Sequence, residues 1–104
     1  MGNLIGMMVN VRHKGDGAIL GSLSHVYRIE RGGISAIGSI HPMIVPNKPD
    51  GTLDLKELEY IIPPNNVHLP QPRVVVLENS HNICHGRVLP MSYIKKMKKL
   101  CDKH

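Results

Sequence analysis

The feature that most constrains the fold is the run Val74-Val75-Val76-Leu77. Four consecutive apolar residues, three of them β-branched, are typical of a strand that is covered on both faces, as in parallel sheets flanked by helices. The polar segment Glu78-Asn79-Ser80-His81-Asn82 follows at once and predicts a loop at the carboxyl end of this strand. Short apolar segments at 18–20, 35–37 and 43–45 predict three further strands.

Amphipathic segments alternate with these strands. A stripe of apolar residues predicts a helix over 1–12, formed by Leu4, Ile5, Met8, Val9 and Val11. Ser22 or Ser24 is placed to cap a short helix near His25, which Gly32-Gly33 should end. Asp54 with Glu57 has the spacing of a capping box.

The helix that starts at this capping box should run to Pro63-Pro64, with an apolar face made of Leu55, Leu58, Ile61 and Ile62. A last helix should begin near Met91, with Ile94, Met97 and Leu100 inward and lysines outward. Fully apolar strands that alternate with amphipathic helices predict an α/β fold with a mostly parallel sheet. Ligands bind such sheets at the carboxyl ends of the strands, which points to the loops holding His25 and 78–82.

Composition narrows the classes of protein. The 104 residues suit one domain, and they carry 13 Lys+Arg against 8 Asp+Glu, a net charge of +5. No apolar run is long enough to cross a bilayer, and the N-terminus has no features of a secretory signal. Two cysteines are too few for a disulfide framework, so we expect a cytoplasmic protein. Because no segment could span a bilayer, we expect no membrane partner.

Two alternative functions rest on local patterns. His81, Cys84, Cys101 and His104 have the spacing of metal ligands, but a polar loop, a buried thiol and a chain end explain the same residues. Five lysines between Lys95 and Lys103 resemble a nucleic-acid patch, yet no aromatic residues interleave with them. We therefore predict neither a metal site nor nucleic-acid binding. By spacing alone, His25 and His68 are ordinary histidines.

A resemblance goes further than spacing. It is carried, in this order, by Met1-Gly2-Asn3-Leu4, Ile19-Leu20-Gly21, Ser24-His25-Val26, Asp50-Gly51-Thr52-Leu53-Asp54, Leu77-Glu78-Asn79-Ser80-His81-Asn82 and Gly86-Arg87-Val88-Leu89-Pro90. Over its whole length the chain resembles the L-threonine aldolases, which are pyridoxal-phosphate-dependent lyases of the aspartate-aminotransferase-like fold (fold type I). The resemblance implies an α/β, partial three-layer sandwich that belongs to the large domain of such an enzyme.

The resemblance also implies roles for particular residues. His25 is similar to the histidine that stacks on the cofactor ring, and His68 to a second histidine near the substrate hydroxyl. Met1, Gly2 and Asn3 resemble the end of a loop whose backbone amides hold the cofactor phosphate at a helix N-terminus. The implied substrate is a small amino acid, and the implied assembly is a homotetramer.

Departures from the family pattern shape the expected function. The first half of the phosphate loop, the Asp-x-x-Arg element and the cofactor-binding lysine have no counterpart here, so we expect residues 1–104 to form one partial domain, incomplete at both ends. His85 stands where the family usually has glycine, a position that requires either a close backbone approach or a positive φ. The expected family reaction is cleavage of L-threonine or L-allo-threonine to glycine and acetaldehyde, with this chain alone inactive. The alternative is a non-catalytic remnant or an interaction protein.

Overall fold

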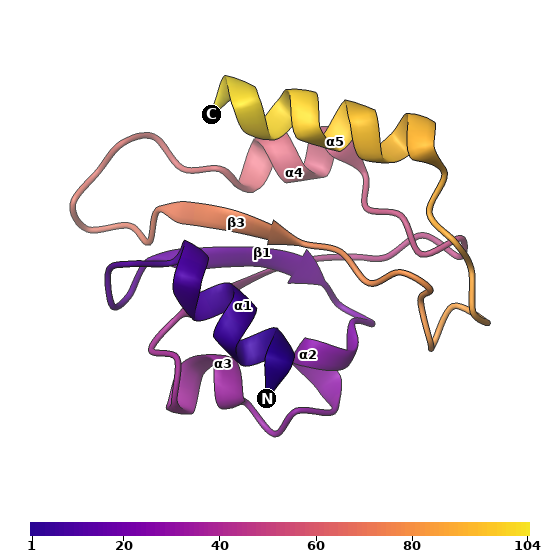
Figure 1. The fold of residues 1–104 in the computed structure, drawn as a ribbon. Helices are drawn as coiled ribbons and strands as arrows, with labels where there is room; N and C mark the ends of the chain where they lie inside the picture. Colours follow the sequence, from indigo (N-terminus) through magenta and orange to yellow (C-terminus); the bar gives the residue numbers. More distant parts are fainter.

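The computed structural model describes residues 1–104 as a three-layer α/β fold (Figure 1). A parallel sheet of three strands, in the order β2-β1-β3, has α1, α2 and α3 on one face and α4 and α5 on the other. The element bounds are α1 Gly2–Asn10, β1 Gly17–Gly21, α2 His25–Arg28, α3 Gly33–Ala36, β2 His41–Val45, α4 Leu55–Ile61, β3 Pro72–Val76 and α5 Met91–Lys103. The predicted parallel α/β fold is confirmed.

The central strand β1 is the most buried part of the chain. All five of its residues are buried, and it pairs with β2 on one side and with β3 on the other. Ala18 and Leu20 pack toward the layer of α1 and α3, whereas Ile19 packs toward α4 and α5. Successive side chains of a strand point to opposite faces, so β1 contributes to both cores.

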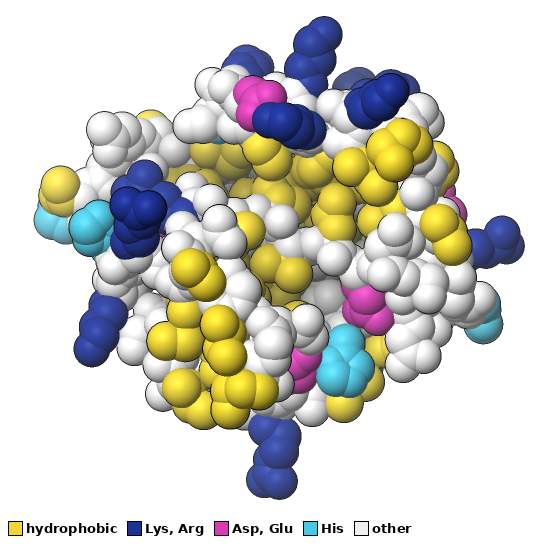
Figure 2. All heavy atoms as spheres, in the orientation of Figure 1, with side chains coloured by type: hydrophobic (Ala, Val, Ile, Leu, Met, Phe, Trp, Pro, Cys, Tyr) yellow, Lys and Arg dark blue, Asp and Glu magenta, His cyan; other side chains and the backbone are white.

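The valine-rich strand has a different place from the one predicted. Residues 74–77 were expected to be fully covered, but β3 ends at Val76, lies at an edge of the sheet and is half-buried. A valine run shows that both faces of a strand meet apolar neighbours, but it does not show whether a strand lies on each side. Figure 2 shows apolar side chains at the surface between α5 and α1, and a groove here is lined by Gly2, Met7 and Val74 to Leu77.

The first helix buries a narrower stripe than predicted. Leu4, Met7 and Val11 are buried, whereas Ile5, Met8 and Val9 are exposed. Residues separated by three and four positions share one helix face, and the observed three follow that spacing. The expectation that Ile5, Met8 and Val9 face the core is therefore wrong.

The segment 35–37 forms no strand. Gly32 has a φ of +71° and lets the chain reverse direction into the short helix α3, so Gly32-Gly33 separates two helices. Ile34 points into the core and Ile37 is exposed. A segment as short as Ser35-Ala36-Ile37 cannot distinguish a strand from one helical turn, because either element can contain it.

The second helical layer follows the prediction closely. The Asp54 side chain caps α4 by accepting a hydrogen bond from the Lys56 N–H at 2.8 Å. Leu58 and Met97 are buried in the core between the sheet, α4 and α5. Of the expected inward residues of α5, Ile94 and Leu100 are half-buried. No helix in this structure is both long and apolar enough to cross a membrane.

His85 adopts the left-handed backbone conformation, with φ +58°. A positive φ was one of the two backbone features expected at this position, where the family usually has glycine; the other was a close backbone approach. The left-handed region costs a residue with a Cβ roughly 1–2 kcal/mol. His85 is exposed, so this conformation is set by the loop and is not offset by burial of the ring.

We predict that His85→Gly raises the free energy of unfolding by about 0.5–1 kcal/mol, because relief of backbone strain exceeds the greater entropy of glycine in the unfolded chain. The matched control is Gly86→Ala, which places a Cβ at φ +70° in open space and should lower stability. Urea unfolding measures both variants. An unchanged or lower midpoint for His85→Gly would contradict the strain argument.

Candidate active site

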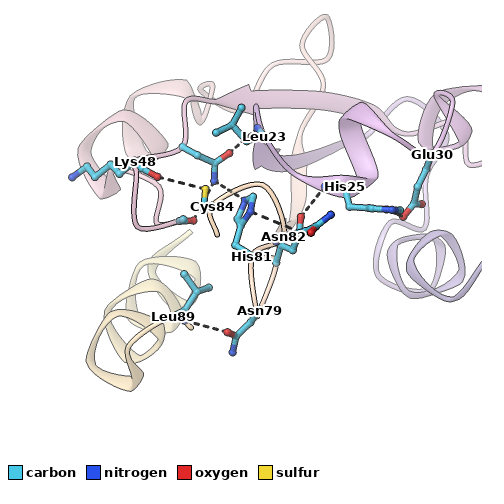
Figure 3. Close-up of polar contacts among 12 residues, drawn as sticks. Leu23, His25, Glu30, Lys48, Asn79, His81, Asn82, Cys84 and Leu89 are labelled. Atoms are coloured by element: carbon cyan, nitrogen blue, oxygen red, sulfur yellow. Dashed lines mark hydrogen bonds and ion pairs between the residues drawn. The ribbon is translucent and has the colours of Figure 1, made fainter. Parts of the chain in front are cut away.

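Three loops meet at the carboxyl edge of the sheet. The turn after β1 leads to His25, the loop after β2 carries Asn47, and the loop after β3 carries Glu78 and His81. Figure 3 shows His25 and His81 at this edge. The strands are parallel, so their carboxyl ends lie together and residues far apart in sequence become neighbours. The sequence-based prediction that His25 and the 78–82 loop share this edge is confirmed by direct contact.

His25 is held by a carboxylate on the segment after its own helix. Glu30 Oε1 lies 2.9 Å from His25 Nδ1 and accepts a second hydrogen bond, of 2.7 Å, from Asn3 Nδ2. The Glu30 side chain is 20% exposed and that of His25 44% exposed. Met1, Asn3, His25 and Glu30 line one cavity of about 490 Å³, so three of the predicted site residues are together.

The charge of Glu30 sets the tautomer of His25. The hydrogen bond from Asn3 lowers the pKa of Glu30, and His25 lowers it further, so the carboxylate is ionised at neutral pH. An ionised carboxylate only accepts hydrogen bonds, so His25 Nδ1 must donate. In the neutral ring the other nitrogen, Nε2, is therefore an acceptor.

Gly2, another predicted cofactor-binding residue, begins α1 at the same edge. Gly2 and Asn3 border the groove beside Val76 and Leu77. The first N–H groups of a helix have no acceptor within the helix, and they favour an anion at this end. Gly2 and Asn3 thus lie at the helix end where backbone donors are free, and Asn3 also lines the cavity that contains His25.

Glu78 connects the loop after β3 with the turn after β1. Its Oε2 accepts a hydrogen bond of 2.7 Å from the His25 N–H, and its Oε1 accepts one of 2.9 Å from the Asn82 N–H. Ser24 is the N-cap residue of α2, as expected for one of two serines, but its side chain makes no capping bond. A carboxylate from a distant loop therefore takes the first N–H of α2.

His68 lies elsewhere. It is exposed in the connection that precedes β3, at the amino end of the sheet, whereas His25 follows β1 at the carboxyl end. A strand of five residues is about 16 Å long. Within this chain the two predicted histidines are therefore not brought together, and the role of His68 stays a prediction.

The residues with metal-ligand spacing do not gather either. His81 and Cys84 lie in the loop before α5, whereas Cys101 and His104 lie at its far end. His104 contacts Glu59 of α4, and Cys84 is buried with its thiol toward the Lys48 carbonyl. Nowhere in residues 1–104 do three such side chains form a group able to hold a metal ion.

Sequence reasoning missed two residues of the site. Glu30 belongs to no recognisable motif. It lies five residues after His25, which is not the spacing of a contact within a helix. A turn after the end of α2 brings its side chain back to His25. Asn47 belongs to a segment that reads only as a turn. Its side chain accepts a hydrogen bond of 2.8 Å from the Leu23 N–H. Polar residues in turns are the one signal that could have drawn attention to it.

We predict that Glu30 stabilises the fold above the ordinary glutamate pKa of about 4.5 and that this contribution is lost on acidification. Its pKa is lower in the folded protein, so the native state binds fewer protons and stability falls as the pH drops through that lowered pKa. The difference in unfolding free energy between the wild type and Glu30→Gln should narrow from pH 7 to pH 3. A difference independent of pH would refute this linkage.

Comparisons with known proteins agree with the resemblance found in the sequence. A family model described as Beta-eliminating lyase matches residues 1–104. The probable low-specificity L-threonine aldolase 2 of Arabidopsis thaliana is 40% identical over 106 residues, which span 100% of this chain and 30% of that protein. The low specificity L-threonine aldolase of Escherichia coli (strain K12) is 35% identical over 90% of this chain and 27% of its own length.

The fold agrees as well. The solved structure of a Leishmania major threonine aldolase superposes with a TM-score of 0.86 at 23% identity, covering 99% of this chain and 29% of that one. This likeness shows the fold alone, and the chain spans about 30% of the length of its plant relatives. The match of the family model over every residue shows the family. The chain belongs to the beta-eliminating lyase family, and its sequence resembles the threonine aldolases within it.

Proposed function

We propose that this chain forms one wall of a threonine aldolase active site. The reaction of the complete site is cleavage of L-threonine or L-allo-threonine to glycine and acetaldehyde, and we place it in the cytoplasm of the cell. The observation that carries the proposal is the group Asn3–Glu30–His25, which holds an imidazole beside the start of α1 at the carboxyl edge of the sheet. Two free cysteines suit a reducing compartment.

The residues present fit part of pyridoxal phosphate, the cofactor that the family implies. The unpaired N–H groups at the start of α1 suit its phosphate, and Met1, Gly2 and Asn3 supply them. His25 is partly exposed and fixed by Glu30, so it has a flat face for an aromatic ring. Bound pyridoxal phosphate supplies an electron-withdrawing ring that takes up the electron pair released when the Cα–Cβ bond breaks.

The contact with Glu30 gives the neutral His25 ring the tautomer that the cleavage requires. Breaking the Cα–Cβ bond of threonine removes a proton from the β-hydroxyl. His25 Nε2 is the acceptor nitrogen, because Glu30 keeps the proton on Nδ1. The imidazole can thus accept the hydroxyl proton at Nε2, and the adjacent carboxylate stabilises the charged ring that forms.

The wall is not a complete site. The residues that line the cavity containing His25 include no lysine, the side chain that would hold the cofactor covalently. In our proposal the cofactor-binding lysine, the partner of the ring nitrogen and the homotetrameric assembly belong to a larger protein of which these residues are one partial domain. The chain alone is then inactive.

A chimera tests this function. This chain replaces the matching segment of the Escherichia coli aldolase, which is 35% identical, and acetaldehyde release from L-allo-threonine is measured in the presence of the cofactor. We expect activity from the chimera and a loss of roughly 10²-fold or more in kcat with His25→Asn, since general bases contribute on that order. His13→Asn, in an exposed turn outside the cavity, is the matched control.

The unmodified chain of 104 residues serves as the second arm of the same experiment. We expect no acetaldehyde from it. A folded but inactive chimera would refute the proposed function, and turnover by the isolated chain would refute the claim that the wall needs other parts.

The alternative function is that of a non-catalytic interaction protein. The edge of β3 and the apolar groove beside it favour this second candidate, because an open strand edge with apolar surface promotes association. It predicts a mass that rises with concentration in light scattering of the isolated chain. A monomer at all concentrations would count against it.

A further inference from the structure

We propose that Glu78, Asn47 and His81 are positioning residues for His25. Glu78 and Asn47 accept hydrogen bonds from the backbone that presents the imidazole, and His81 lies beside both of them. These three side chains are here called the turn clamp; Figure 3 labels His81 and His25. The functional meaning of the clamp rests on the proposed function of His25. Its geometry stands independently of that function.

The clamp holds the turn from two sides. Glu78, after β3, accepts the His25 N–H at 2.7 Å, and Asn47 Oδ1, after β2, accepts the Leu23 N–H at 2.8 Å. The turn between β1 and α2 therefore receives one acceptor from each flanking strand of the sheet. Since His25 is the first residue of α2, these bonds fix the Cα from which its imidazole reaches Glu30.

His81 lies between the two acceptors and is 1% exposed. Its Nε2 is 3.3 Å from Asn47 Nδ2, and its Nδ1 is 4.0 Å from Glu78 Oε1. Asn47 Oδ1 accepts from Leu23, so Nδ2 is the amide nitrogen and donates. His81 Nε2 must accept, which places the proton of the neutral ring on Nδ1, toward Glu78.

The buried Nδ1 of His81 has no hydrogen-bond partner. A buried donor without an acceptor is costly, and Glu78 carries the nearest carboxylate. His81 thus lies between Asn47 and Glu78, with its Nδ1 4.0 Å from the carboxylate. The His81 that sequence reasoning considered as a metal ligand is instead the bridge of the clamp.

Two glycines leave room for the clamp. A Cβ on Gly21 would collide with the Asn47 side chain, and a Cβ on Gly51 would lie 3.1 Å from the Cβ of His81. Gly51 also has a φ of +86° and offers its carbonyl to Asn47 Nδ2 at 3.1 Å. The clamp thus depends on small residues that pack directly against Asn47 and His81.

The test uses the full chain, labelled with ¹⁵N, and follows amide hydrogen exchange together with the imidazole resonances of His25. In Glu78→Ala the amides of His25 and Asn82 should exchange roughly tenfold faster or more, since hydrogen bonds to charged groups are among the stronger ones. The tautomer signals of His25 should change because its ring leaves Glu30. Glu59→Ala, an exposed glutamate of α4 that pairs with Lys103, is the matched control and should change neither.

Conservative variants separate positioning from general destabilisation. Glu78→Gln keeps one acceptor oxygen, so it should protect only one of the two amides. His81→Leu should speed exchange at Leu23 and His25, and His81→Gln should restore part of the protection, because its oxygen can accept from Asn47. Unchanged His25 resonances and exchange in Glu78→Ala and His81→Leu would overturn the proposal.

The chimera supplies a separate readout. There Glu78→Ala should lower kcat roughly tenfold with little change in KM, while Glu59→Ala leaves both unchanged. If the chimera with the unaltered clamp is inactive, the proposed function fails and the exchange result still decides the clamp. Normal kcat in the Glu78→Ala chimera would show that the clamp does not position a catalytic imidazole.

Discussion

The pairing of β1 with a parallel strand on each side is the constraint on which the rest of the structure depends. β1 is buried throughout, and its alternating side chains supply both the core under α1 and α3 and the core under α4 and α5. Parallel strands also have their carboxyl ends at one edge. The same pairing that builds the two cores therefore brings the loops after Gly21, Val45 and Val76 together, and every described contact of His25 lies at that edge.

At this edge, side chains from other segments fix both the ring and the backbone of His25. Glu30 orients the His25 ring, Glu78 holds its N–H, and Asn47 holds the turn before it. Each of the three comes from a different segment, and none is adjacent to His25 in sequence. Glu30 thus gives the neutral His25 ring a defined tautomer, and Glu78 and Asn47 give it a defined position.

Much of the fold could be predicted from local patterns, and the failures have physical reasons. β1, β2, α4 and α5 lie where apolar runs and the Asp54 cap predicted them. Segment 35–37 was wrongly predicted to be a strand, since so short a segment suits a helical turn equally well. The valine run predicted a strand but not its place at an edge. His85 was expected to need either a close backbone approach or a positive φ, and its φ is positive.

By itself the sequence determined the class of fold, the family and the identity of the edge loops. Periodicity, caps and motifs are local properties, so they can be recognised without a structure. It singled out His25 and the segment from Glu78 to Asn82, but not the contact between them. Only the tertiary structure decided that Glu30 and Asn47 belong to the site, that His81 is a buried bridge, and that His68 lies at the opposite end of the sheet. Those facts depend on which strands are neighbours and in which register, and no local pattern encodes that.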